Sequence, residues 1–387
     1  VRPGVDVLLT DSIHLVQGRR VGLITNQTGI GADGVPSIDR LSDHRGTELV
    51  ALFSPEHGIR GTIEAGVDVA DQVDVQTGLP IHSLYGETLK PTPSMLDGIE
   101  ILLFDIQDVG ARYYTYIYTM ALAMEAAGEA SIPFIVLDRP NPVGGRHVQG
   151  NILDPAFASF VGRYPLPMRH GMTTGELAIL FRRSFGVEVD LRVVPIEGWS
   201  RDTMFSDTSL PWRSPSPNMP TLSTATVYPG MCLIEGTLLS EGRGTTLPFE
   251  QVGAPYINAE TLAKTLNKEN LPGLFFRPQY FKPQFQKWSG TICGGVQIHV
   301  TERNKIKPLA TSITVLFSIK KLYPDDFSWR TEAYEFVNDR LAIDLLYGNQ
   351  TLREAIETDT LSINNLKSAW EEDIKIFSPQ REACLIY

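Results

Sequence analysis

Four continuously apolar segments in the first part of the chain predict the strands of a buried sheet. None of them alternates apolar with polar positions, as a strand with one face in water would. Continuous apolar strands are typical of parallel sheets that are covered by helices on both faces. The segments span residues 20–25, 48–53, 100–105 and 133–138.

Helical patterns alternate with these strands. Residues 114–127 form an apolar helical pattern, and the spacing of Thr173 and Glu176 matches a capping box that opens a helix over residues 177–185. Residues 189–196 are then predicted to form another strand. This order of strand, helix and strand predicts an open α/β sheet.

The alternation breaks between residues 198 and 226, where four prolines indicate a linker or a crossing loop. We therefore predict a first domain over residues 1–212 and a second, smaller α/β or α+β domain over residues 213–387. The second domain is predicted to contain a helix that is capped by Asn258 and runs to Leu266, a strand over residues 295–300, and helices over residues 308–322, 331–346 and 365–374.

The composition is that of an ordinary globular protein. Of the 387 residues, 42% are hydrophobic and 20% are charged, which excludes an intrinsically disordered chain. The net charge of -11, without runs of Lys or Arg, argues against a nucleic-acid or anionic-membrane partner. No stretch approaches the roughly 20 apolar residues that span a bilayer, so no membrane span is expected.

Cysteine usage does not decide the compartment, since one disulfide with one free thiol is an alternative to three thiols. Cys232, Cys293 and Cys384 match no zinc-site spacing, and we expect three buried thiols. The sequence starts at Val1 rather than at Met, so we expect that a leader has been removed.

Polar side chains follow each of the four predicted strands. Because ligands of open parallel sheets bind beyond the carboxyl ends of the strands, four such ends on one rim indicate a polar cleft. A single end would be explained more simply as a hydrogen-bonded turn. The residues are Asn26 after the first strand, Glu56 and His57 after the second, Asp105, Asp108, Arg112 and Tyr113 after the third, and Asp138, Arg139 and Asn141 after the fourth.

Glu56 is the best candidate for a proton donor. It lies beside His57, with Arg60 four residues on and Glu64 beyond. An acid of the neighbouring strand end, such as Asp108, could supply a second carboxyl, and two carboxyls that flank a cleft are the minimum for glycoside hydrolysis. The simpler alternative is a structural ion pair between Glu56 and Arg60. A metal site is disfavoured, because only one histidine is local.

A polar, glycine-rich loop in the second domain offers further ligand groups. Glu241 and Arg243 lie within the segment Ser-Glu-Gly-Arg-Gly-Thr. An arginine among glycine amides and hydroxyls is suited to holding a carboxylate-bearing ligand, although a structural turn is an equal alternative. Tyr113, near the rim of the sheet, is a candidate for stacking on a sugar ring.

A dinucleotide site is disfavoured. Gly29, Gly31 and Gly34 match the pattern G-x-G-x-x-G, but three residues separate them from the preceding strand. The fingerprint requires an acid at the end of the second strand, but Glu48 stands at the start of that strand. We therefore expect no cofactor.

Several longer motifs resemble a single family along nearly the whole chain. The family is that of the NamZ-type exo-β-N-acetylmuramidases, peptidoglycan glycoside hydrolases that were formerly a domain-of-unknown-function family. The motifs span residues 22–29, 53–61, 105–116, 138–145, 169–177, 215–220 and 235–245.

The resemblance implies a Rossmann-like first domain, a smaller second domain and an active cleft between them. It implies release of N-acetylmuramic acid from the non-reducing end of peptidoglycan fragments, without a nicotinamide cofactor. The proposed catalytic glutamate of the family falls on Glu56, within Ser-Pro-Glu-His-Gly. Its partner carboxylate stays open among Glu64, Asp108 and Glu241.

The resemblance also implies a substrate with a carboxylate and an exported protein. The lactyl carboxylate of muramic acid needs a cation, for which Arg60, Arg112, Arg139 and Arg243 are available. Members of the family are typically exported, so we expect a periplasmic or cell-surface location in a bacterium.

The mechanism and two other classes of function stay open. The 2-acetamido group of the substrate could itself attack the anomeric carbon, and the second acid would then orient that amide. A non-catalytic protein that binds wall fragments would use the same arginine pocket without turnover. A nucleotide-dependent enzyme would be stabilised by its cofactor.

Overall fold

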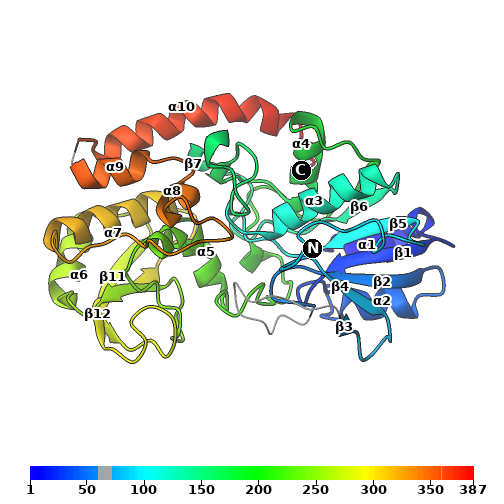
Figure 1. Cartoon of the computed structure of the whole chain (residues 1–387), viewed down its shortest axis with the longest axis horizontal. Coiled ribbons are helices and arrows are strands. Elements are labelled where there is room, and N and C mark those ends of the chain that lie inside the picture. The colour runs from blue at the N-terminus through cyan, green and yellow to red at the C-terminus, as the bar shows by residue number, and fades with distance from the viewer. Residues whose placement is uncertain (60–71, 359) are drawn as a thin grey trace.

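The computed structural model describes residues 1–59, 72–358 and 360–387. The first half of the chain forms a seven-stranded sheet (Figure 1). Neighbouring strands are parallel, except that the first strand in the order is antiparallel to the second. The order is β3 (Gln72–Val73), β4 (Pro80–Ser83), β2 (Glu48–Ser54), β1 (Arg20–Thr25), β5 (Ile101–Asp105), β6 (Phe134–Leu137) and β9 (Leu191–Val194).

Both faces of this sheet are covered, which explains the continuously apolar strands. Successive side chains of a strand point to opposite faces, and the buried apolar residues accordingly form two clusters. Leu23, Leu52 and Leu103 belong to the cluster that includes α1 (Gly4–Asp11) and α2 (Ser37–Asp43). Ile24, Phe53 and Phe104 belong to the cluster that includes α3 (Tyr116–Glu129) and α4 (Thr174–Ser184).

The predicted elements of the first half are confirmed. The four apolar segments are β1, β2, β5 and β6, and the helix predicted from residue 114 is α3. The capping box of α4 is present, since the Glu176 carboxylate accepts a hydrogen bond from the Thr173 amide at 3.0 Å and the Glu176 amide donates to the Thr173 hydroxyl. The strand predicted over residues 189–196 is shorter and forms β9, at the edge of the sheet.

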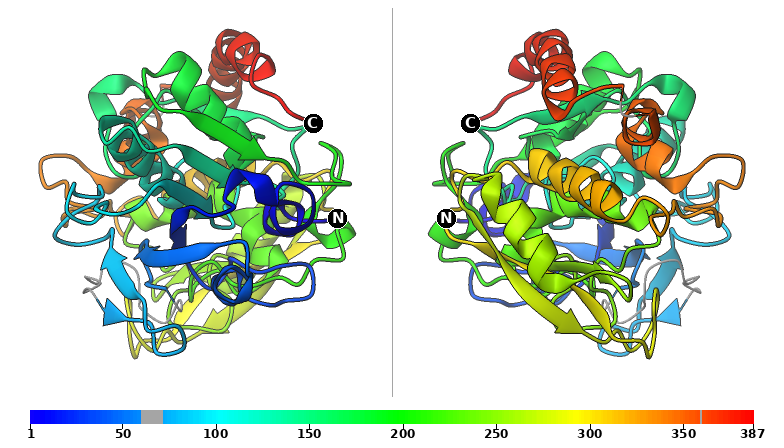
Figure 2. Two further views of the ribbon diagram at one scale, coloured as in Figure 1. Left: turned by 90° about the vertical axis from the view of Figure 1, so that its right-hand side faces the viewer. Right: turned by 90° about the vertical axis from the view of Figure 1, so that its left-hand side faces the viewer.

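The second half folds around a three-stranded antiparallel sheet. Its order is β10 (Gln251–Ala254), β12 (Cys293–Val300) and β11 (Leu274–Phe281), and no apolar pattern had indicated β10 or β11. The helix α6 (Ala259–Lys268) packs on β11 and β12, and α7 (Pro308–Leu322) lies beside α6 (Figure 2). Asn258 caps α6 as predicted, accepting a hydrogen bond from the Thr261 amide. The smaller domain is therefore α+β.

The last long helix ties the two halves together. Figure 1 shows α10 (Ile363–Glu382) running from α9 (Thr351–Thr358) towards α4. It packs on β7 (Gln149–Ile152), which pairs with β8 (Pro167–Arg169). The larger apolar cluster continues from α3 through α5 (Leu222–Met231) and α7 to α10, so the halves share one core. A domain boundary at residue 212 stays a prediction.

Short helices complete the chain. The α-helix α8 (Ala342–Tyr347) precedes α9. The four 3-10 helices of the described residues are η1 (Ile13–Leu15), η2 (Pro155–Phe157), η3 (Phe205–Asp207) and η4 (Cys232–Gly236).

The prediction of a helix over residues 331–346 is wrong. Only the last part of that segment is helical, as α8, and Tyr334 and Val337 instead close a tight turn through two backbone hydrogen bonds of 2.9 Å. The apolar residues of the segment have helical spacing but contact different parts of the molecule. Tyr334 is buried, whereas the exposed Phe336 contacts aromatic rings of the first half. Tertiary contacts therefore outweigh the local pattern.

Two further sequence expectations can be compared with the fold. In the described part of the chain, no helix combines the length and apolarity needed to cross a membrane. Cys232, Cys293 and Cys384 are buried free thiols, as predicted. Burial raises the pKa of the Cys232 thiol, which is typical of a structural cysteine.

Candidate active site

A cavity of about 400 Å³ lies between the two halves, beyond the carboxyl end of β2. One wall comes from the residues after β2 and from the segment before α3. The other wall comes from three loops of the second half, over residues 235–249, 286–287 and 330–336. The predicted cleft between the halves is therefore present. The sequence-predicted site residues on its walls are Glu56, His57, Tyr113, Glu241 and Arg243.

Glu56 is buried and hydrogen-bonded at the start of a helix. Its side chain is buried, and the Thr115 hydroxyl donates to Glu56 Oε2 at 2.7 Å. Thr115 is the N-cap of α3, and the positive end of a helix dipole stabilises a nearby anion. His57 Nε2 lies 3.9 Å from Glu56 Oε1. Thr115 lies within the motif over residues 105–116, but a hydroxyl residue at a helix start indicates a cap rather than a site residue.

Unusual backbone geometry is concentrated around this cavity. Nine non-glycine residues in the described part of the chain have a positive φ, and five of them line the cavity. Such left-handed conformations are strained and cluster at functional sites. The five are His57, Phe249, Gln286, Glu335 and Phe336.

The second half contributes a compact cluster of paired charges. Arg243 donates to Glu235 at 2.7 Å and lies 3.4 Å from Glu241, while the Lys287 ammonium donates to Glu241 at 2.9 Å. Burial opposes ionisation of Glu235, but Arg243 outweighs it and lowers the pKa of this carboxyl. Burial likewise disfavours the charged form of Arg243, yet the two glutamates raise its pKa. These charges are therefore fixed on the cavity wall.

Four further residues of the wall, Ala333, Tyr334, Glu335 and Phe336, come from the segment predicted as a helix, and Arg330 directly precedes it. Arg330 lies with its guanidinium 5.2 Å from the centre of the Tyr334 ring, and Glu335 and Phe336 follow in the turn. The Tyr85 hydroxyl donates to Glu335 at 3.2 Å. Burial and the negative charge of Glu56 raise the pKa of Glu335 to about 8. The helix-like spacing of the neighbouring apolar residues concealed this segment.

Asp105 and Arg139 lie at the predicted rim but not on the cavity wall. Arg139 binds both carboxylate oxygens of Asp105, at 2.6 and 2.9 Å, and donates to the carbonyl of Ile30. Ser37 also donates to Asp105. Asp105 is therefore used in this buried pair, away from the cavity wall.

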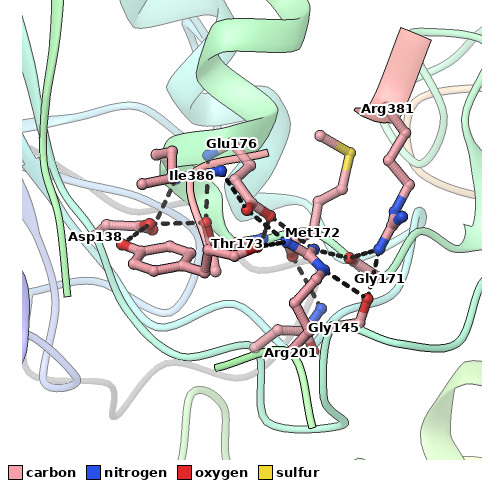
Figure 3. A network of polar contacts seen from close by, with 12 residues as sticks. Asp138, Gly145, Gly171, Met172, Thr173, Glu176, Arg201, Arg381 and Ile386 are labelled. Carbon is pink, nitrogen blue, oxygen red and sulfur yellow. Dashed lines mark hydrogen bonds and ion pairs between the residues drawn. The ribbon is translucent and has the colours of Figure 1, made fainter. Parts of the chain in front are cut away.

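Asp138 and Asn141 also have structural roles, in hydrogen bonds around the start of α4. Asp138 is fully buried at the N-terminus of α4, where it accepts hydrogen bonds from Thr173 at 2.7 Å and from the Tyr387 hydroxyl at 2.9 Å (Figure 3). Burial raises the pKa of Asp138 to about 6. The amide of Asn141 donates to the carbonyl of Met172. The structure thus places both residues in turns that hold α4, away from the cavity wall.

Arg112 joins the two halves instead of facing the cavity. Its guanidinium is fully buried and donates to four backbone carbonyls. Asn151 and Leu166 in the first half accept at 2.9 and 2.8 Å, and Leu346 and Tyr347 at the end of α8 accept at 2.9 and 2.7 Å. A cation at the C-terminus of a helix satisfies carbonyls that have no partner within the helix.

The remaining predicted residues divide into two groups. Asn26 and Asp108 lie off the cavity wall: Asn26 accepts from the Thr28 amide, and Asp108 accepts from the Gly110 amide and lies 3.5 Å from His170. Arg60 and Glu64 fall outside the described residues.

Comparisons with known proteins identify the family. The N-terminal domain described as exo-β-N-acetylmuramidase NamZ matches residues 21–223, and the corresponding C-terminal domain matches residues 226–387. The peptidoglycan β-N-acetylmuramidase NamZ of Bacillus subtilis (strain 168) is 50% identical over 387 residues, which cover 100% of this chain and 91% of that protein.

Two solved structures from Bacteroides fragilis NCTC 9343, both of DUF1343 family proteins, have the same fold. They superpose with TM-scores of 0.89 and 0.77 at 36% and 30% identity, each covering 100% of this chain and 98% of the other. Two matching domains and full-length relatives together establish that the chain belongs to the NamZ exo-β-N-acetylmuramidase family.

Proposed function

We propose that this chain is an exo-acting glycoside hydrolase that releases N-acetylmuramic acid from the non-reducing end of peptidoglycan fragments. The observation that carries this proposal is the buried Glu56 carboxyl on the wall of a cavity of about 400 Å³, within the size range of small-ligand pockets. Membership of the NamZ family and the name of the Bacillus subtilis relative support the same reaction.

Glu56 is one of the two carboxyls of the proposed reaction. Glycoside hydrolysis by two carboxyls needs a protonated group that delivers a proton to the leaving oxygen and an ionised group on the other side of the bond. The hydrogen bond from Thr115 and the position at the N-terminus of α3 suit Glu56 to carry charge during turnover.

The cavity wall also offers a cation for the lactyl carboxylate of the substrate. Arg243 and Lys287 are each bound to buried glutamates, whereas Arg330 lies 3.8 Å from the carboxylate of Glu332, which is exposed. Arg330 is therefore the least committed of these three cations, and we assign the lactyl carboxylate to it. It takes the place of Arg112 and Arg139, whose guanidinium groups are used in the frame.

Export is part of the proposal. Peptidoglycan lies outside the cytoplasmic membrane, so an enzyme of this specificity meets its substrate in the periplasm or at the cell surface. Fractionation of the native host, with immunodetection of this chain, tests the location. Detection only in the cytoplasm would contradict it.

The reaction is tested by release of free N-acetylmuramic acid from the disaccharide MurNAc-GlcNAc. We expect release by the wild type and a loss of about 10²- to 10⁴-fold in kcat for Glu56→Gln, the range for removal of one acid–base group. The exposed Glu188 provides a matched control, since Glu188→Gln removes a carboxyl remote from the cavity. Saturable binding without release would favour a wall-fragment binding protein, and full activity of Glu56→Gln would refute the assignment of Glu56.

A further inference from the structure

The turn between Tyr334 and Val337 has a backbone that its residues do not favour. Tyr334 and Val337 exchange two backbone hydrogen bonds, and the two residues between them have φ values of +43° and +67°. Two-residue connections with a positive φ at both positions favour Asn-Gly. Here Glu335 and Phe336 occupy them, so the surroundings impose the conformation on unsuitable residues.

The two side chains of the strained turn lie in different parts of one cavity. Glu335 is partly buried and accepts a hydrogen bond from the Tyr85 hydroxyl at 3.2 Å, on the same cavity as Glu56. Phe336 is 60% exposed, with its ring centroid 5.7 Å from that of Tyr85 and 6.2 Å from that of Phe160. An apolar ring that is held in water at the edge of a cavity is a surface for a ligand.

Glu335 and Glu56 have different neighbours. Burial raises the pKa of Glu335 to about 8, together with the negative charges of Glu56 and Glu235 and against the opposing effects of Tyr85 and Arg243. Glu335 is therefore protonated at neutral pH. Glu56 instead has a hydroxyl donor and a helix N-terminus beside it. A carboxyl that keeps its proton at neutral pH is suited to act as the acid of a carboxyl pair.

We propose that this turn completes the active site: Glu335 is the proton donor of the reaction, Glu56 is its ionised partner, and Phe336 contacts the sugar on the leaving-group side. The inference rests on the proposed function. It differs from the sequence-based assignment of the proton to Glu56, because only the fold brings Glu335 to the cavity.

The step is balanced in atoms and charge. The Glu335 carboxyl gives its proton to the glycosidic oxygen as the bond from that oxygen to the anomeric carbon breaks. Water supplies the hydroxyl that ends on the anomeric carbon, and Glu56 takes up the proton that this water loses. Transfer of one proton from Glu56 to Glu335 through solvent restores the starting state.

The position of Phe336 follows from that of Glu335. An exo-acting enzyme holds the terminal sugar inside the cavity, and the rest of the substrate extends outwards. The proton donor must contact the oxygen between these parts. The next side chain along the turn, which is exposed at the cavity edge, then lies beside the outer sugar.

The proton donor is tested with two substrates that differ only in their leaving group. GlcNAc needs a proton to leave MurNAc-GlcNAc, whereas 4-nitrophenolate leaves 4-nitrophenyl-MurNAc unprotonated. For Glu335→Gln we expect kcat to fall by about 10²- to 10⁴-fold on the disaccharide and by less than about tenfold on the nitrophenyl substrate. Glu56→Gln should lose activity on both, and the exposed Asp339 gives the control variant Asp339→Asn.

The outcomes separate the inference from the proposed function. A wild type that is inactive on both substrates refutes the proposed function. An active wild type with an equally active Glu335→Gln refutes the inference alone, as does a selective loss on the disaccharide in Glu56→Gln.

Two further variants guard against a folding artefact and test the aromatic contact. The double substitution Glu335→Asn, Phe336→Gly installs the residues that the turn prefers, so we expect a higher melting temperature together with lost disaccharide hydrolysis. Phe336→Ala should raise KM for the disaccharide by about tenfold or less, the effect of losing one aromatic contact, and leave kcat on the nitrophenyl substrate unchanged. An unchanged KM for the disaccharide contradicts the role of Phe336, and an active double variant contradicts that of Glu335.

Discussion

Replacing Arg112 by methionine tests whether this arginine builds the frame of the site or binds substrate. The side chain donates to four buried backbone carbonyls, two in each half of the molecule. Methionine keeps much of the length and apolar volume of the side chain but none of the donors. Substrate binding was the role expected from its place after β5, so the two roles predict opposite effects.

The expected loss of stability can be worked out from these contacts. A buried carbonyl that loses its donor costs about 1–3 kcal/mol. The carbonyls of Leu166 and Tyr347 keep a second donor, the Leu153 amide at 3.2 Å and the Asn151 side-chain amide at 2.8 Å, so the other two cost roughly 2–6 kcal/mol. Part of this is offset, because burial lowers the pKa of Arg112 and its charge is itself unfavourable there. We therefore expect the free energy of unfolding to fall by about 3 kcal/mol, a large share of the roughly 5–15 kcal/mol of a typical domain.

Urea unfolding followed by circular dichroism measures this difference. Arg163, whose partly exposed guanidinium lies 3.0 Å from Glu125, provides the control, since Arg163→Met should cost about 1 kcal/mol or less. KM of folded Arg112→Met for the disaccharide should stay within about threefold of the wild type, because Arg112 does not touch the cavity. A loss below about 1 kcal/mol combined with a tenfold rise in KM would show that Arg112 binds the substrate.

Two other predictions concern pH and the packing of the last residues. The rate on the disaccharide should fall as the pH rises through about 8. At that pH Glu335, whose pKa is raised to about 8, loses the proton that it donates. A pH profile of Glu335→Gln should lack this alkaline limb, and an unchanged limb would contradict the assignment. Tyr387→Phe removes the hydrogen bond to Asp138 and also the acceptor of the Ile196 amide, and it should lower the free energy of unfolding by about 2–4 kcal/mol at neutral pH, without changing kcat. Since the pKa of Asp138 is about 6, its carboxylate is ionised above that pH and accepts a stronger hydrogen bond. Urea unfolding should therefore show a smaller stability difference between wild type and Tyr387→Phe at pH 5 than at pH 7. An equal difference at both pH values would argue against a charged acceptor.

The strand and cap predictions succeeded because they depend on neighbours in the sequence. Continuous apolar runs produced β1, β2, β5 and β6, and the spacing of Thr173 and Glu176 produced the cap of α4. These patterns reflect burial on both faces of a sheet and the unpaired amides at a helix start. The strands β10 and β11 gave no comparable signal; in β11 the exposed Phe275 and Tyr280, which point to opposite faces, blur the pattern.

The candidate site was only partly predictable, for a different reason. Strand-end position correctly indicated a polar rim, and the motif around Glu56 led to the cavity. Position on the rim does not say which side chains are already bound to the protein. Arg139 satisfies Asp105, and Asp138 holds the start of α4, so these groups are not available to a ligand.

The sequence by itself determined the open α/β sheet and the family, and it led to the cavity through the motif around Glu56. Each of these can be inferred from short stretches of sequence, because the apolar pattern, the residue spacing and the motifs involve only neighbouring residues. Only the tertiary structure decided that Glu335 shares a cavity with Glu56, that Arg112 joins the halves, and that Asp138 is part of the frame. The physical reason is that charge, burial and hydrogen bonding depend on the atoms that surround a group, and segments far apart in the sequence supply those atoms.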